Sequence, residues 1–138
     1  GKHDLENDHI IIFGLGLGYH LDQVMTRKAP GTRVLLVEPD LEIVYHSLNT
    51  LDWPQLLTRE DFFYFFGADS NLLSATIEKF VDVIRFDRLE VVELQSEVRF
   101  LAGFFTNVKE LIDNEVRALL YDFKTRLAEE AVLPRNVL

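Results

Sequence analysis

The chain contains the segment His9-Ile10-Ile11-Ile12-Phe13-Gly14-Leu15-Gly16-Leu17-Gly18-Tyr19-His20-Leu21. Residues 9–13 form a short, continuous, β-branched apolar run, which is typical of a strand buried on both faces of a parallel sheet. Three glycines follow at alternate positions, and Leu21, Val24 and Met25 then have the three-and-four spacing of a helix. The segment therefore predicts a buried strand, a turn over 14–18 and a helix that begins near Tyr19.

The alternation of strands and helices continues beyond this segment. Arg33–Glu38 reads as a second buried strand. Pro39-Asp40 then opens a second helix, whose expected inner face consists of Leu41, Val44, Tyr45 and Leu48. Asp52-Trp53-Pro54 marks a turn that begins a further helical turn through Leu57. This order of elements is typical of α/β folds.

Two further strands are predicted downstream. Phe62–Phe66 is a run of five aromatic residues, and we expect an inner strand covered on both faces, because an exposed run of this kind would promote aggregation. A helix follows, capped within Asp69-Ser70-Asn71. Leu89–Leu94 predicts a fourth strand nearer an edge, since Glu90 and Glu93 interrupt its apolar residues.

The rest of the chain keeps helical spacing as far as Leu127. A helix of that length either projects beyond the domain or breaks near Asp113-Asn114. It packs on the domain or connects it to another one, and both interpretations stay open. We predict an α/β fold, a three-layer Rossmann-like sheet of about four mostly parallel strands ordered 3-2-1-4, with a long C-terminal helical segment. The expected division is 1–96 for the α/β domain and 97–138 for the helix.

Composition limits the classes of function. The 138 residues amount to about one domain. The formal net charge of −9 disfavours nucleic acid and anionic lipid as partners, and the absence of cysteine excludes disulfides and thiolate chemistry. No apolar run is long enough to cross a membrane, and the polar residues 1–8 do not form a signal peptide. We expect a cytoplasmic piece of a longer protein.

The glycine segment and the end of the second strand form the one candidate binding site. Gly14 permits a tight turn, Gly16 lets the backbone approach a ligand, and Gly18 lets the helix lie close to the strand. The start of the helix offers N–H groups to an anionic group. Glu38, about 20 residues further on, is placed to accept hydrogen bonds from a ribose diol. Glycines that serve only packing, with Glu38 solvated at the strand end, remain the alternative.

Three further residues are candidates for the same site. Tyr19 and His20 lie at its mouth, where the histidine is placed to bind a phosphate or transfer a proton. Asp69 follows the third strand and is placed to approach an adenine, although a helix N-cap is the preferred interpretation. No metal site and no Ser/His/Asp arrangement is predicted.

The residues 10–21 and Val34-Leu35-Leu36-Val37-Glu38-Pro39-Asp40 resemble the N-terminal region of the motility accessory factor (Maf) family. Gly-x-Gly-x-Gly-Tyr-His and Glu-Pro-Asp carry the likeness, and Phe66-Gly67-Ala68-Asp69 adds modest support. The resemblance implies a Rossmann-like module of a multidomain protein that glycosylates flagellin with nonulosonic acids. It implies a catalytic centre in a following domain, so no catalytic residue carries over to this sequence.

Three functions follow as hypotheses. The first is a module of a flagellin-glycosylation protein that is non-catalytic or binds a nucleotide. The second is a methyltransferase-like domain, because Gly-x-Gly-x-Gly resembles the first motif of S-adenosylmethionine-dependent methyltransferases. That family carries an acid where this chain has Phe13, and needs about three more strands, so a nucleotide is the expected ligand. The third is an interaction scaffold, whose acidic surface and terminal helix contact flagellin or an export chaperone.

Overall fold

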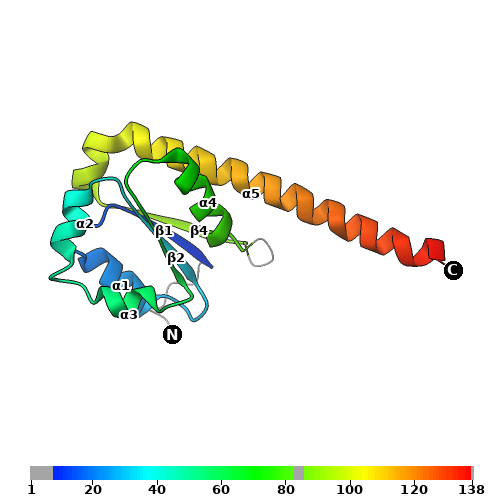
Figure 1. Ribbon diagram of the computed structural model, residues 1–138, viewed down its shortest axis with the longest axis horizontal. Helices are drawn as coiled ribbons and strands as arrows, with labels where there is room; N and C mark the ends of the chain where they lie inside the picture. The colour runs from blue at the N-terminus through cyan, green and yellow to red at the C-terminus, as the bar shows by residue number, and fades with distance from the viewer. Residues whose placement is uncertain (1–7, 83–85, 138) are drawn as a thin grey trace.

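The computed structural model describes residues 8–82 and 86–137 of the chain. Strands and helices alternate along the first two thirds of the sequence, as predicted, and a single long helix follows (Figure 1). The elements are β1 (His9–Phe13), α1 (Tyr19–Arg27), β2 (Arg33–Glu38), α2 (Leu41–Ser47), α3 (Trp53–Leu57), β3 (Phe62–Phe66), α4 (Ser70–Phe80), β4 (Leu89–Glu93) and α5 (Gln95–Val137).

The four strands form one parallel sheet in the order β3-β2-β1-β4, which confirms the predicted order. Ile11, at the centre of β1, is aligned with Leu35 of β2 and Val91 of β4. Both neighbours of β1 run in its own direction, so the connections cross the sheet through helices. All five residues of β1 are buried, as the continuous apolar run predicted.

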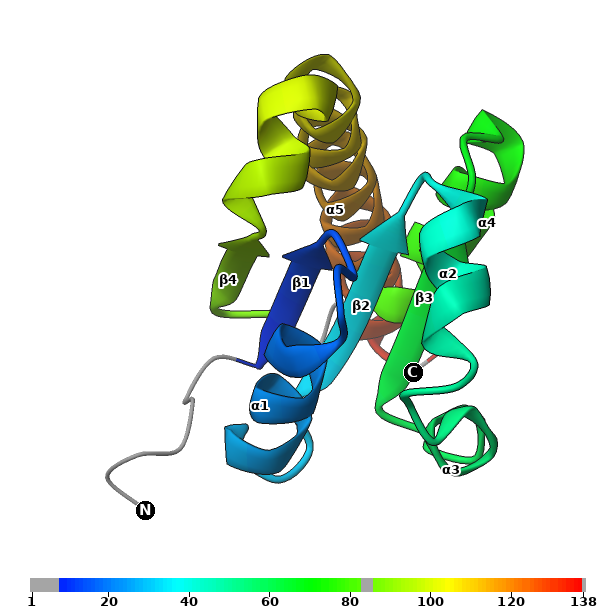
Figure 2. The same ribbon diagram turned by 90° about the vertical axis from the view of Figure 1, so that its left-hand side faces the viewer.

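Helices cover both faces of the sheet, and this gives the predicted three layers (Figure 2). Alternate strand residues point to opposite faces, so even-numbered and odd-numbered residues of β1 enter different cores. Ile10 and Ile12 belong to the core beneath α1 and α3, together with Trp53. Ile11 and Phe13 belong to the core beneath α4 and α5. The alternation explains why β1 has no polar face.

β3 corrects one prediction. In the part of the chain that the structure describes, this strand lies at the edge of the sheet and pairs with β2 alone, so the expectation of an inner strand is wrong. Phe62 and Phe65 are buried, Phe63 and Phe66 are half-buried, and Tyr64 is 46% exposed. Phe63 and Phe65 enter the core beneath α4 and α5, and Phe62 and Phe66 enter the opposite core, because successive side chains point to opposite faces. Tyr64 shares the face of Phe62 and Phe66, with which it stacks.

α2 corrects a second prediction. Leu41, Tyr45 and Leu48 were expected on its inner face, but all three are exposed. The helix turns Ile43 and Val44 toward the core instead, and buries Ser47. The Ser47 hydroxyl donates to the Val44 carbonyl at 2.6 Å and accepts from the Trp53 indole at 2.9 Å. This contact with α3 sets the rotation of α2, which apolar spacing alone does not reveal.

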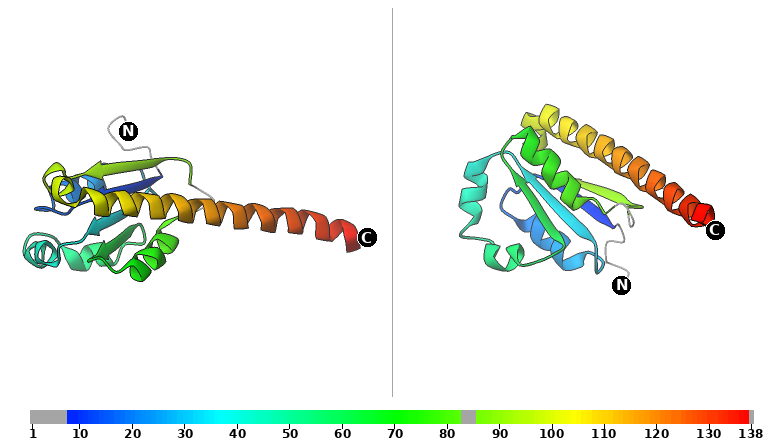
Figure 3. Two further views of the ribbon diagram at one scale, coloured as in Figure 1. Left: turned by 90° about the horizontal axis from the view of Figure 1, so that it is seen from above. Right: turned by 45° about the vertical axis from the view of Figure 1, so that its right-hand side comes forward.

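α5 is a continuous helix, so of the two alternatives it projects beyond the domain and does not break near Asp113-Asn114. Its first half packs against the sheet through Phe105, Val108, Ile112 and Val116. Its second half extends away from the α/β domain, as Figure 1 and the left view of Figure 3 show. Within the described residues, none of the helices combines the length and the apolar character that crossing a membrane requires.

Candidate functional site

The glycine loop joins β1 to α1, as predicted. Gly14, Gly16 and Gly18 have φ angles of +95°, +52° and +91°, a region that side-chain-bearing residues seldom adopt. The Gly18 N–H donates to the Leu15 carbonyl at 2.9 Å, which closes the turn, and α1 begins at Tyr19. The three glycines are therefore required by the path of the backbone, whether or not a ligand binds there.

Glu38, at the end of β2, faces the glycine loop. One carboxylate oxygen accepts the Leu15 N–H at 2.8 Å, and the other accepts the Asp40 N–H at 3.0 Å. Glu38 is 0% exposed, so the alternative of a solvated strand end is wrong. The carboxylate connects the loop after β1 with the turn that begins α2. Its contact with a ribose diol stays a prediction, and such a ligand would have to compete with these two N–H groups.

The chain's own side chains occupy the space next to the glycines. A Cβ atom on Gly16 would lie 2.7 Å from Cδ2 of Leu94, and one on Gly18 would lie 2.8 Å from Cδ2 of Leu51. Both distances are shorter than a van der Waals contact, so a side chain at either position would require the leucine to move. Leu94, between β4 and α5, and Leu51, in the loop after α2, therefore approach the glycine backbone where a ligand was expected.

The carboxyl ends of the strands are joined to one another across the sheet. Leu94 N–H donates to the Phe13 carbonyl at 3.0 Å, Gly14 N–H to the Val37 carbonyl at 2.9 Å, and Gly67 N–H to the Glu38 carbonyl at 3.0 Å. The structure thus brings the glycine loop, Glu38 and the loop before Asp69 to one edge, where ligands of open α/β sheets bind. The predicted residues come together as a connected corner.

The outer candidates are exposed. Tyr19 and His20 both lie at the surface in the first turn of α1. The Asp69 carboxylate accepts from the N–H groups of Asn71 at 2.9 Å and Leu72 at 3.0 Å, so its preferred role as the N-cap of α4 is confirmed. A role of Asp69 toward an adenine stays a prediction. Tyr19, His20 and Asp69 are the members of the predicted set that are exposed to solvent.

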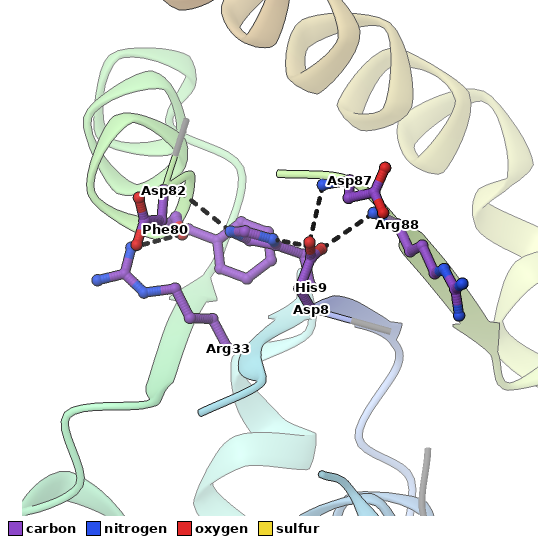
Figure 4. Close-up of polar contacts among 7 residues, drawn as sticks. All are labelled: Asp8, His9, Arg33, Phe80, Asp82, Asp87 and Arg88. Atoms are coloured by element: carbon purple, nitrogen blue, oxygen red, sulfur yellow. Dashed lines mark hydrogen bonds and ion pairs between the residues drawn. The ribbon is translucent and has the colours of Figure 1, made fainter. Parts of the chain in front are cut away.

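A second polar cluster, at the amino end of the sheet, escaped the sequence analysis (Figure 4). His9 is buried, and its Nε2 accepts the Asp82 N–H at 3.0 Å. Nδ1 therefore carries the ring proton and donates it to the Asp8 carboxylate at 2.9 Å. Asp8 also accepts the N–H groups of Asp87 at 2.7 Å and Arg88 at 3.1 Å. The signal in the sequence was the pair of adjacent polar residues Asp8 and His9 where the buried strand begins.

This cluster holds the neutral form of His9. Burial lowers the pKa of the His9 imidazole, and the hydrogen bond to the Asp8 carboxylate opposes that shift only in part. The ring packs edge-on against Phe80, with centroids 5.1 Å apart, and lies 4.7 Å from Phe86. Both ring nitrogens have partners within the chain, so the pair joins α4 to the entry of β4 and presents no free base to a substrate.

Comparisons with known proteins agree with this architecture. Residues 2–62 match the family described as the glycosyltransferase Maf N-terminal domain. Among solved structures, the Maf glycosyltransferase from Magnetospirillum magneticum AMB-1 is similar, with 22% identity and a TM-score of 0.54. The match covers 78% of this chain but 19% of that chain, so this sequence spans about a fifth of that relative's length. At this identity the likeness shows the fold alone, and the search of curated proteins found no match.

The residues that match the family include most of the candidate site. The matched range contains β1, the glycine loop, α1 and β2 with Glu38, which together form the connected corner at the carboxyl edge of the sheet. Residues 2–62 are therefore similar to the glycosyltransferase Maf N-terminal domain, and this match confirms the resemblance that the sequence indicated.

Proposed function

We propose that this chain is a non-catalytic module of a Maf-type protein that glycosylates flagellin with a nonulosonic acid in the bacterial cytoplasm. The α/β part over 1–96 is the structural unit, and the helical segment over 97–138 links it to the remainder of such a protein. Flagellin is then a partner of the whole protein, and the transfer chemistry belongs to another domain.

The burial and the hydrogen bonds of the Glu38 carboxylate support the proposal of a non-catalytic role. Both of its oxygens hold backbone N–H groups, and the side chain is fully buried. Leu94 and Leu51 lie against Gly16 and Gly18. A site arranged to receive a nucleotide needs an accessible carboxylate and open space above the glycines. The observed packing therefore favours a structural role of the glycine corner over nucleotide binding.

Nucleotide binding is the second candidate function. It is supported by the position of the glycine loop and Glu38 at the carboxyl ends of neighbouring parallel strands. Tyr19 and His20 are exposed beside the N-terminus of α1. A phosphate near these residues would meet the positive end of the helix dipole. Binding would require the Leu15 N–H to leave Glu38. A methyltransferase-like role is weaker, because Phe13 is buried where that family has an acid, and β4 leads directly into α5.

Calorimetry with CMP, UDP, NAD and S-adenosylmethionine separates these candidates. We expect no saturable heat with any of the four at millimolar concentration. Tyr19→Ser and His20→Ala are the matched variants, because both change exposed side chains. Gly16→Val is unsuitable as a binding variant, since its clash with Leu94 would also disturb the fold. Saturable binding that both surface variants weaken would establish a ligand site instead.

A transfer assay tests the module role. The purified chain, supplied with flagellin and an activated nonulosonic acid, should show no glycosyl transfer, whereas a protein that also contains the downstream domain should. Transfer by the chain alone, lost on Glu38→Gln while the variant remains folded, would contradict a non-catalytic role.

A further inference from the structure

Among the strands of residues 8–82 and 86–137, none pairs with the outer edge of β3. In a parallel ladder, alternate residues direct their peptide groups to opposite sides. The Val34 N–H donates to the Asp61 carbonyl at 2.8 Å, and the Gly67 N–H donates to the Glu38 carbonyl at 3.0 Å, so the odd-numbered residues face β2. The N–H and C=O groups of Phe62, Tyr64 and Phe66 therefore point away from the sheet.

A groove follows this edge. Its volume is about 400 Å³, and it is lined by Phe62–Phe66 together with Leu72, Thr76 and Lys79 of α4. On one face, the Tyr64 ring stacks between those of Phe62 and Phe66, with centroid distances of 6.2 and 5.0 Å. On the other face, α4 forms a wall. Tyr64 is 46% exposed and Leu72 is 55% exposed, so the groove presents apolar surface beside the free backbone edge.

Lys79 is the one charged residue that lines this groove. Its carbonyl accepts a hydrogen bond from Arg33, whose guanidinium lies 4.8 Å from the centroid of the Phe63 ring, so Lys79 lies toward the amino end of β3. Within residues 8–82 and 86–137, no carboxylate is paired with its ammonium group. Lys79 therefore places a positive charge beside the apolar groove, in a chain whose net charge is −9.

We propose that this groove binds an extended segment of another protein, which adds to β3 as an antiparallel strand. The free N–H and C=O groups of β3 would pair with the backbone of the segment. The alternate apolar side chains of the segment would lie between the stacked rings of Phe62, Tyr64 and Phe66 on one face and α4 on the other. Antiparallel pairing is the more stable arrangement and places the carboxyl end of the segment beside Phe62. A carboxylate there would pair with Lys79. A second copy of this chain is disfavoured, because two chains of charge −9 repel each other.

The probe is a short fluorescein-labelled peptide of alternating valine and threonine that ends in glutamate, and fluorescence anisotropy measures its binding to the whole chain. Leu72→Glu should weaken binding at least tenfold. Leu57→Glu is the matched control, because Leu57 is also 55% exposed but does not line the groove. Circular dichroism checks that both variants remain folded.

A charge exchange tests the role of Lys79. Lys79→Glu should weaken binding of the glutamate peptide and strengthen binding of an otherwise identical peptide that ends in lysine. A peptide methylated on alternate backbone nitrogens should not bind, because it lacks the N–H groups of an added strand. Equal affinity for Leu57→Glu and Leu72→Glu, or no binding of either peptide, would overturn the proposal. So would concentration-dependent dimerisation that Leu72→Glu abolishes, since a second copy would then occupy the edge.

Discussion

Replacing Glu38 by glutamine tests whether the buried carboxylate stabilises the corner of the fold. The carboxylate accepts two backbone hydrogen bonds, at 2.8 Å from Leu15 and 3.0 Å from Asp40, and water does not reach it. A glutamine amide has one oxygen to accept and an NH₂ group that can only donate. One of the two N–H groups therefore loses its acceptor and faces another donor.

The expected cost follows from these two bonds. Loss of a hydrogen bond to a charged group costs about 1.5–3 kcal/mol, and a buried donor without a partner costs about 1–3 kcal/mol. The two estimates describe the same N–H group and are not added, so we expect Glu38→Gln to lower the free energy of unfolding by about 1.5–3 kcal/mol. For a domain of this size, about 4 °C per kcal/mol gives a fall in Tm of roughly 6–12 °C.

Chemical denaturation and a thermal scan by circular dichroism measure this change. Glu60→Gln is the matched control, because Glu60 is exposed, and its effect should stay within about 0.5 kcal/mol. Amide hydrogen exchange provides a local readout, since Leu15 or Asp40 should lose protection in Glu38→Gln before the rest of the sheet does. Equal stability of Glu38→Gln and Glu60→Gln would refute the structural role of the carboxylate and return Glu38 to the list of ligand-binding residues.

Three other measurements test the remaining contacts. Burial lowers the pKa of His9, so the folded chain binds fewer protons than the unfolded one, and stability should fall as the pH drops below about 6.5. The variant His9→Gln should flatten this pH dependence of stability between pH 7.5 and 5.5. The control variant His46→Gln, which changes an exposed histidine, should keep it. Phe65→Ala should cost about 3–5 kcal/mol by denaturant unfolding, because the ring is buried, whereas Tyr64→Ala at the open edge should cost less than about 1.5 kcal/mol. Asp69→Ala should cost about 1 kcal/mol through loss of the α4 cap, and an unchanged midpoint would show that the cap contributes nothing.

Local sequence was sufficient for the elements and their order. The apolar run 9–13, the glycines and the helical spacing after them specify a strand, a turn and a helix, because each depends on neighbours within a few residues. The parallel arrangement also followed, since helices separate the strands and parallel strands need such crossovers. Asp69 was assigned as a cap for the same reason, because its hydrogen bonds reach only to Asn71 and Leu72.

Tertiary structure decided which surfaces are covered. Five aromatic residues predicted an inner strand at 62–66, but the place of a strand in the sheet depends on which strands pair with it, and β3 pairs with β2 alone. The rotation of α2 depends on the bond between Ser47 and Trp53, and the continuity of α5 on packing against the sheet as far as Val116. Periodicity gives the spacing of apolar residues along an element but not the partner that it meets.

The same distinction applies to the candidate site. The sequence alone placed Gly14, Gly16, Gly18 and Glu38 at one edge, because the carboxyl ends of neighbouring parallel strands lie together. Only the folded chain decides what the Glu38 carboxylate bonds to, since Leu15 and Asp40 reach it from two different loops. In the sequence, a glutamate that is exposed to water and one that accepts two backbone N–H groups look the same. They differ only in the solvent and the donors that the tertiary structure places around the carboxylate.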